Sequence, residues 1–218
     1  MTGDSRASSP VVGIDLDGTL IDTWRRQELL LNSVMTNFGI QDHLSNFVQM
    51  KRQGLSTEQV LSKFGFSSAI SRRIAGAWKE EVESAEWLRE DLLFEDTVPF
   101  LETWNVDFIL CSARSNREGL HQQLQALGIE HLLASISCVA PGHLVSKRKA
   151  VVWQRANVAI VIGDTEIDAQ AAHEIGVPAY LLYRGARSQS FLRTRGWHSH
   201  ERLPRTFEMS CLIRAGNR

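Results

Sequence analysis

The segment VVGIDLDGTLID, residues 11–22, decides the fold expected for this chain. Its first four residues predict a buried strand that runs directly into Asp15, and Asp17 follows two residues later. Two carboxylates this close repel each other, and burial strengthens the repulsion. Asp-Gly is also a common turn dipeptide, so Asp17 and Gly18 alone could simply end a strand. The rest of the sequence must decide between a turn and a site that uses both carboxylates.

Further short apolar segments predict buried parallel strands, and segments with helical spacing lie between them. The expected strands are 11–15, 106–112, 135–139, 158–164 and 178–183, and the expected helices are 117–128, 146–156 and 166–176. This alternation predicts an α/β fold, namely a Rossmann-like parallel sheet with helices on both faces. Sheets of this kind bind ligands at the carboxyl ends of their strands.

A long helical block interrupts the alternation after the first strand. Residues 70–90 place apolar side chains on one face of a single amphipathic helix, and residues 25–38 and 57–64 also have helical spacing. We therefore expect a small all-α cap inserted into the core, with Trp78 and Trp87 packed inside it.

These boundaries give a two-domain organisation. The expected domains are an α/β core of residues 1–22 and 92–218, with residues 1–9 disordered, and a helical cap of residues 23–91. The hinge between them is expected near Thr23 and in residues 90–95, so that cap closure can control the access of water.

Polar side chains follow the predicted strands at one edge of the sheet. They are Asp15 and Asp17, then Ser112 and Arg114, then Lys147 at the start of a helix, and finally Asp164 and Asp168. Each is ordinary alone, because a lysine is usually solvated and a serine at a strand end is usually a cap. Their joint occurrence in this order indicates a shared site.

The order Asp-x-Asp-Gly-Thr, Ser, Lys and Gly-Asp-x-x-x-Asp resembles the haloacid dehalogenase-like hydrolase superfamily over roughly residues 10–200. The position of the cap is similar to that in the phosphoglycolate phosphatase and β-phosphoglucomutase branch. The resemblance implies a Mg²⁺-dependent phosphatase that acts on a small phosphorylated metabolite through an aspartyl-phosphate.

The resemblance also assigns roles to individual residues. Asp15 is the expected nucleophile, and Asp17 the acid that protonates the leaving oxygen and then the base that activates water. The expected metal site is formed by Asp15, Asp17 through its main-chain carbonyl, Asp164 and, as a supporting residue, Asp168. The expected phosphate-binding groups are Lys147, the Ser112 hydroxyl and the main-chain N–H groups of Leu16 and Ala113, with Thr19 bracing Asp17.

Three assignments stay open at this point. Apolar residues follow three and four positions after Lys147 and equally after Lys149, so either could be the lysine of the motif. We favour Lys147 because it lies at the helix start. Arg114 either contacts a second anionic group of the substrate or pairs with a carboxylate. Lys51 and Arg52 either contact a substrate phosphate or carboxylate or form a solvated basic turn.

Other functions fit this pattern less well than a phosphatase does. A sugar-phosphate mutase is the main alternative enzyme, and a catalytically silent binding protein is disfavoured because Asp15 and Asp17 are both present. Asp17 also argues against a dehalogenase, and Lys51 gives little support for a phosphonatase that forms a Schiff base. An inserted cap would hinder a polymer, so a nucleic-acid end phosphatase is not expected.

Composition adds further limits. The net charge of −1 over 218 residues does not favour nucleic acid or an anionic membrane, and no apolar segment approaches the ~20 residues of a membrane span. Cys111, Cys138 and Cys211 match no zinc spacing and are expected as free thiols in a reducing compartment. We therefore expect a cytoplasmic protein, and the sequence identifies no oligomer interface.

Overall fold

The computed structural model describes residues 9–41 and 44–216. Within these residues, six parallel strands form a sheet in the order β5–β4–β1–β6–β7–β8. The strands are β1 (Val11–Ile14), β4 (Asp107–Ser112), β5 (Ser135–Cys138), β6 (Ile160–Gly163), β7 (Ala179–Leu182) and β8 (Ser199–His200). The expected α/β fold with a parallel sheet is confirmed.

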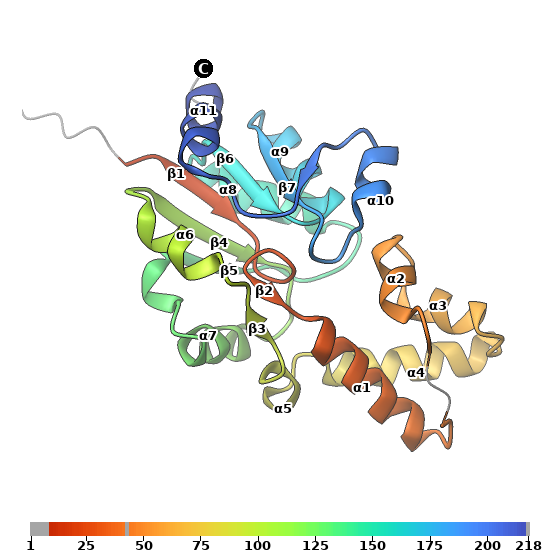
Figure 1. Cartoon of the computed structure of the whole chain (residues 1–218). Helices are drawn as coiled ribbons and strands as arrows, with labels where there is room; N and C mark the ends of the chain where they lie inside the picture. Colours follow the sequence, from red (N-terminus) through yellow and green to blue (C-terminus); the bar gives the residue numbers. More distant parts are fainter. Residues whose placement is uncertain (1–8, 42–43, 217–218) are drawn as a thin grey trace, which may run out of the picture.

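Helices cover both faces of this sheet because successive side chains of each strand point to opposite sides (Figure 1). Val12 and Ile14 face one layer, whereas Ile109 and Val161 face the other. The first layer contains α6 (Thr97–Thr103), α7 (Arg117–Ala126) and α11 (Thr206–Gly216), and the second contains α8 (Val145–Arg155) and α9 (Glu166–Glu174). A short helix, α10 (Gln189–Thr194), packs beside β7, and the 3₁₀ turn η1 (Glu130–Leu132) follows α7.

A helical insertion leaves the core after β1 and returns before β4. It enters through β2 (Ile21–Asp22) and leaves through β3 (Leu92–Leu93), and these two strands pair antiparallel. The helices are α1 (Trp24–Asn37), α2 (Phe47–Arg52), α3 (Thr57–Lys63), α4 (Ser68–Glu81) and α5 (Ala85–Leu88), which together we call the helical insertion. It has its own hydrophobic core, against which Trp78 and Trp87 pack. The domain boundaries stated above remain a prediction.

The single helix expected over residues 70–90 is wrong. The structure has two helices there, because Ser84 adopts an extended conformation with ψ of 151° and begins α5 as its N-cap. The preceding residue, Glu83, contacts the core instead: its carboxylate accepts from the N–H groups of Ser115 and Asn116, and its carbonyl accepts from the Asn116 amide. Helix α2 and the two-residue strands β2, β3 and β8 were not expected.

One expectation concerns residues that the structure does not describe. The disorder expected for residues 1–9 falls almost entirely on residues 1–8, which lie outside the described part of the chain. Among the helices that are described, none combines the length and the apolar character that crossing a bilayer requires.

Replacing Trp153 tests the packing of the second layer. Its buried indole lies flat on β1, where a Cβ on Gly13 would come within 2.9 Å of the ring. We expect Trp153→Ala to lower the free energy of unfolding by about 3–5 kcal/mol, measured by urea denaturation. Val151→Ala, on the exposed face of the same helix, should change it by less than about 0.5 kcal/mol. Similar losses in both variants would contradict this packing.

Candidate active site

Neighbouring strands bring three carboxylates to one edge of the sheet. Asp15 directly follows β1 and Asp164 directly follows β6, and the main-chain N–H of Asp15 donates to the Ile162 carbonyl at 2.9 Å. Asp168 lies in the first turn of α9, where its Oδ2 accepts hydrogen bonds from the main-chain N–H and the hydroxyl of Thr165. All three side chains are buried, and each offers an oxygen within 4.8 Å of the others. We call Asp15, Asp164 and Asp168 the carboxylate cluster.

The lysine at this cluster is Lys149, which corrects the preference for Lys147. The Lys149 ammonium donates to Asp15 Oδ1 and to Asp168 Oδ1, both at 2.6 Å. Helix α8 begins at Val145, and positions four residues apart share a helix face, so Val145, Lys149 and Trp153 all face the core. Lys147 lies between these positions and is exposed.

The charges in this cluster do not balance. When all three carboxyls are ionised, the single ammonium of Lys149 leaves two negative charges buried without a counter-charge. Burial raises the pKa of Asp15 to about 7, although the charge of Lys149 opposes the rise. Burial and the charges of Asp15 and Asp168 likewise raise the pKa of Asp164 well above its usual range.

The carboxylate cluster therefore fits a divalent cation. Asp164 Oδ1 is buried and has no hydrogen-bond partner among the described residues, whereas Oδ2 accepts from the main-chain N–H of Ala186. Gly18 and Gly185 allow the backbone to approach, since a Cβ on either would lie 2.2 Å from Asp164 Oδ2. Buried carboxylate oxygens with an excess of negative charge are the donors that hard cations such as Mg²⁺ and Ca²⁺ prefer.

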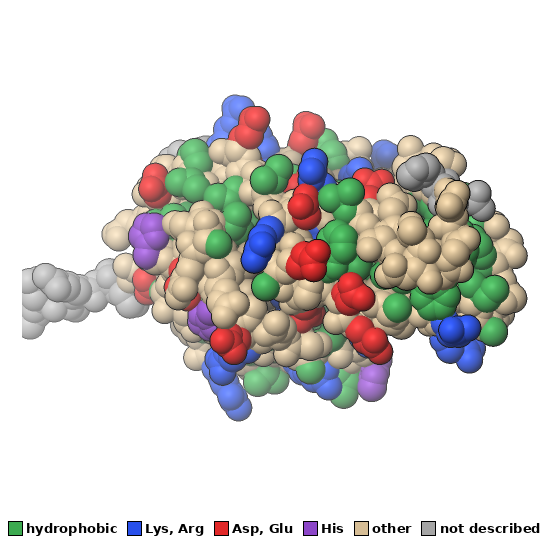
Figure 2. Space-filling view, turned by 90° about the horizontal axis from the view of Figure 1, so that it is seen from below, with side chains coloured by type: hydrophobic (Ala, Val, Ile, Leu, Met, Phe, Trp, Pro, Cys, Tyr) green, Lys and Arg blue, Asp and Glu red, His purple; other side chains and the backbone are tan. Residues whose placement is uncertain are grey.

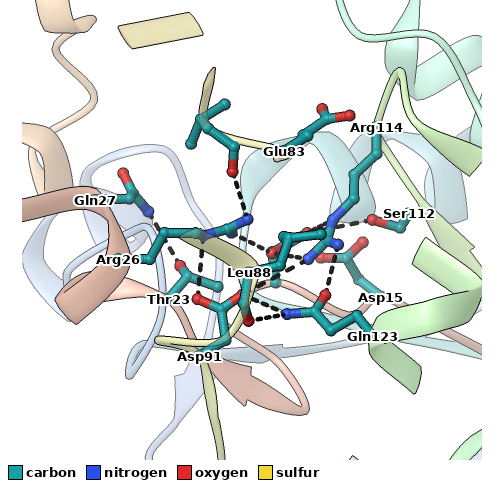
Figure 3. A network of polar contacts seen from close by, with 12 residues as sticks. Asp15, Thr23, Arg26, Gln27, Glu83, Leu88, Asp91, Ser112, Arg114 and Gln123 are labelled. Carbon is teal, nitrogen blue, oxygen red and sulfur yellow. Dashed lines mark hydrogen bonds and ion pairs between the residues drawn. The ribbon is translucent and has the colours of Figure 1, made fainter. Parts of the chain in front are cut away.

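Asp17 is not part of the cluster, and its side chain is held by two arginines, Arg26 and Arg114, which Figure 3 labels. Arg114 donates from Nε to Oδ2 at 2.7 Å and from Nη2 to Oδ1 at 2.6 Å, and Arg26 donates to Oδ1 at 2.9 Å. Although burial acts to raise it, the pKa of Asp17 is held well below its usual range by these charges and hydrogen bonds. Of the two roles left open for Arg114, the structure displays the pairing with a carboxylate.

Among the expected phosphate-binding groups, Ser112 contacts one of these carboxylates directly. The Ser112 hydroxyl, at the end of β4, donates to Asp17 Oδ2 at 3.3 Å. Thr19 is buried, but its hydroxyl has no hydrogen-bond partner among the described residues, so bracing of Asp17 by Thr19 is not seen. Leu16 is buried between Asp15 and Asp17, and Ala113 lines a cavity of about 660 Å³ next to the end of α4.

Lys51 and Arg52 lie where the helical insertion meets the core. Lys51 is half-buried, donates to the Thr57 hydroxyl at 3.1 Å and lies 5.3 Å from the centre of the Trp78 ring. Burial and the nearby charge of Arg187 lower the pKa of Lys51 to about 8. Arg52 donates to the Tyr183 carbonyl, and its own carbonyl accepts from the Ser188 N–H at 2.9 Å. Arg52 thus ties the insertion to the core beside β7 rather than forming a solvated turn.

Three further polar residues near Asp17 were not singled out from the sequence. Arg26, Asp91 and Gln123 are all buried and linked to Asp17 or Arg114 by hydrogen bonds or ion pairs. Each is one polar residue in a helix or linker, with no motif around it. Their connection with Asp17 is visible only in the folded structure, where their side chains meet.

Comparisons with known proteins agree with this geometry. A family model described as haloacid dehalogenase-like hydrolase matches residues 14–182. No curated protein matches the chain.

Solved structures resemble the chain along most of its length. A proposed phosphatase from Clostridium difficile has 18% identity and a TM-score of 0.73, covering 94% of this chain and 99% of its own. A proposed phosphoglycolate phosphatase from Lactobacillus delbrueckii has 17% identity and a TM-score of 0.72, with the same coverage. A haloacid dehalogenase-like family hydrolase from Streptococcus pneumoniae has 19% identity and a TM-score of 0.69, covering 88% of this chain and 92% of its own. At these identities the likeness concerns the fold.

The two lysines of α8 form a matched pair for a stability test. Without added metal, Lys149→Met should lower the free energy of unfolding by about 3–5 kcal/mol, because it leaves buried carboxylates without a counter-charge. Lys147→Met should change it by less than about 0.5 kcal/mol. Urea denaturation at neutral pH measures both, and equal effects would refute the placement of Lys149.

The raised pKa values predict how stability depends on pH in the presence of a chelator. The pKa of Asp15 rises from 3.8 to about 7 on folding, so between these values the folded state binds a proton that the unfolded state has lost. Stability therefore falls as pH rises from about 4 to about 7, by at most about 1.4 kcal/mol per pH unit for each such group.

Mg²⁺ should remove most of this fall, which thermal unfolding across the same pH range can measure. Asp164→Asn removes one of the buried charges, so it should flatten the pH dependence and weaken the stabilisation by Mg²⁺. A pH dependence that Asp164→Asn leaves unaltered would show that the carboxylate cluster does not cause it.

Proposed function

Because the chain belongs to the haloacid dehalogenase-like hydrolase family, we propose that it is a Mg²⁺-dependent phosphatase of small phosphorylated metabolites. The observation that carries this proposal is the position of Asp15. Its carboxylate lies in a buried cluster with Asp164 and Asp168, is held by Lys149, and is followed two residues later by a separately held carboxylate, Asp17. Two carboxylates with different partners, one suited to act as a nucleophile and one suited to acid–base chemistry, support this proposal.

The carboxylate cluster is the proposed Mg²⁺ site, with the main-chain carbonyl of Asp17 as a further ligand. The unbalanced negative charge and the unpartnered Asp164 Oδ1 support a cation there. When bound, Mg²⁺ neutralises negative charge on the carboxylates and on the transferring phosphoryl group. Asp168 is oriented by Lys149 and Thr165, which suits it to a supporting role at the metal.

In the first proposed step, a carboxylate oxygen of Asp15 attacks phosphorus and the bond from phosphorus to the leaving oxygen breaks. Lys149 holds the Asp15 carboxylate in one orientation and contributes a positive charge. The Ser112 hydroxyl and the main-chain N–H groups of Leu16 and Ala113 are proposed to bind the phosphoryl oxygens. The leaving oxygen takes a proton from Asp17, which must first acquire one in competition with its arginines.

In the second step, water attacks the phosphorus of the aspartyl-phosphate and releases inorganic phosphate. Asp17 accepts a proton from that water, and the bond between phosphorus and the Asp15 oxygen breaks, which regenerates Asp15. The low pKa of Asp17 favours its ionised form, which is the form that a base requires.

The helical insertion favours a small substrate. It contacts the core on both sides of the site, through Arg52 at the Ser188 N–H and through Glu83 at the N–H groups of Ser115 and Asn116. A long polymer would have to pass between these contacts. Figure 2 shows acidic side chains along the middle of one face, with basic ones scattered among them, which does not suit a polyanion. Cys111, Cys138 and Cys211 are free thiols, which supports the proposed cytoplasmic location.

A panel of phosphorylated metabolites with Mg²⁺ tests the proposal. We expect release of inorganic phosphate from at least one of them, loss of that release on removing Mg²⁺, and a loss of at least about 1000-fold in Asp15→Asn. Asp107→Asn, an exposed aspartate at the start of β4, serves as the matched control and should retain activity.

Two outcomes would change the assignment. Phosphate release that persists in Asp15→Asn would refute Asp15 as the nucleophile. Conversion of one phosphosugar into its isomer without net phosphate release would identify a sugar-phosphate mutase instead.

A further inference from the structure

Asp17 and four other side chains form a closed ring of polar contacts, and Figure 3 labels the four partners of Asp17. Starting from Asp17, the ring runs through Arg26, Asp91, Gln123 and Arg114 and back to Asp17. Arg26 lies 2.9 Å from Asp17 (Nη2 to Oδ1) and 3.1 Å from Asp91 (Nε to Oδ1). Gln123 lies 2.7 Å from Asp91 (Nε2 to Oδ2) and 2.6 Å from Arg114 (Oε1 to Nη1). Arg114 closes the ring at 2.6 Å from Asp17 (Nη2 to Oδ1). We call this set the Asp17 ring.

The members of the Asp17 ring come from both the core and the helical insertion. Asp17 and Arg114 follow β1 and β4 of the core, and Gln123 lies on α7. Arg26 lies on α1 of the helical insertion, and Asp91 lies in the connection by which the insertion returns to the core. The four residues other than Asp17 are only 2–5% exposed. A ring this buried cannot replace a lost contact with water.

Gln123 completes the ring because it both accepts and donates. Its Oε1 accepts from Arg114 Nη1, and its Nε2 donates to Asp91 Oδ2 and to the Leu88 carbonyl at 3.1 Å. Two arginines and two aspartates otherwise balance in charge, so the ring needs no additional ion. The contact between Arg26 Nε and Asp91 Oδ1 is an ion pair without hydrogen-bond geometry, and the other contacts of the ring are hydrogen bonds. Buried polar networks of this kind fix the orientation of their side chains.

We propose that Gln123 and Asp91 are positioning residues for Asp17, acting through Arg114 and Arg26 in the hydrolysis of the aspartyl-phosphate. This inference rests on the proposed function, because it concerns the step in which Asp17 accepts a proton from water. Arg114 donates a hydrogen bond to each carboxylate oxygen of Asp17, so the orientation of the guanidinium determines the orientation of the carboxylate. Gln123 holds that guanidinium from its far side, while Asp91 holds both Gln123 and Arg26.

Gln123→Leu tests the proposal with p-nitrophenyl phosphate in a rapid-mixing assay with Mg²⁺. p-Nitrophenolate leaves without taking a proton, so formation of the aspartyl-phosphate does not require Asp17, whereas its hydrolysis does. We expect a burst of p-nitrophenolate with a rate constant within about threefold of wild type, followed by steady-state turnover about tenfold slower than wild type. General damage to the fold would slow both phases together.

Gln122→Leu is the matched control, because Gln122 precedes Gln123 on α7 and is exposed. It should leave both phases unchanged. Gln123→Met, which retains more of the side-chain length, is the second variant if Gln123→Leu unfolds, and it should show the same separation of phases.

The outcomes separate this inference from the proposed function. Suppose that wild type turns over the substrate and that the Gln123 variants show either two unchanged phases or two equally slowed phases. Either result would overturn the positioning role alone. Absence of Mg²⁺-dependent turnover in wild type would instead overturn the proposed function.

Discussion

The constraint on which the site depends is the burial of Asp15, Asp164 and Asp168 against one lysine. Isolated charges are expensive to bury, and Lys149 offsets only part of this cost through its two contacts of 2.6 Å. Lys149 is fixed in turn by α8, whose Val145 and Trp153 pack on the same face. The hydrophobic layer under α8 therefore determines where the positive charge lies, and the remaining imbalance favours a divalent cation.

Asp15 and Asp17 can lie two residues apart because they do not share partners. The chain leaves β1 after Ile14 and turns, with the N–H groups of Thr19, Leu20 and Ile21 all donating to the Leu16 carbonyl. The turn sends Asp15 to Lys149 and Asp17 to Arg114 and Arg26. The repulsion between the two carboxylates is thus reduced because each pairs with different cationic side chains. The same short segment therefore forms the turn and supplies both carboxylates of the site.

The sequence predicted the elements that local patterns encode. Apolar segments located the five longer strands of the sheet, and the carboxylates at their ends were expected at one edge. The choice between Lys147 and Lys149 depended on the helix face that each lysine occupies, because only Lys149 shares the core-facing side of α8 with Val145 and Trp153. The expected start of this helix differed from the observed one by a single residue, so it did not settle the choice. The Asp17 ring was not predictable, because Arg26 and Asp91 are separated by most of the insertion and pair only after folding. The short strands β2 and β3 have two residues each, too few for a periodic pattern.

The pairing of β2 with β3 has a consequence for how such a protein can diversify. Asp22 and Leu92 are partners across this ribbon, so the helical insertion starts and ends at adjacent points on the core. Closing a loop whose ends are already adjacent adds little entropic cost when the loop grows or shrinks. The length and surface of the insertion beyond Arg26 can therefore change while the sheet and the carboxylate cluster keep their geometry.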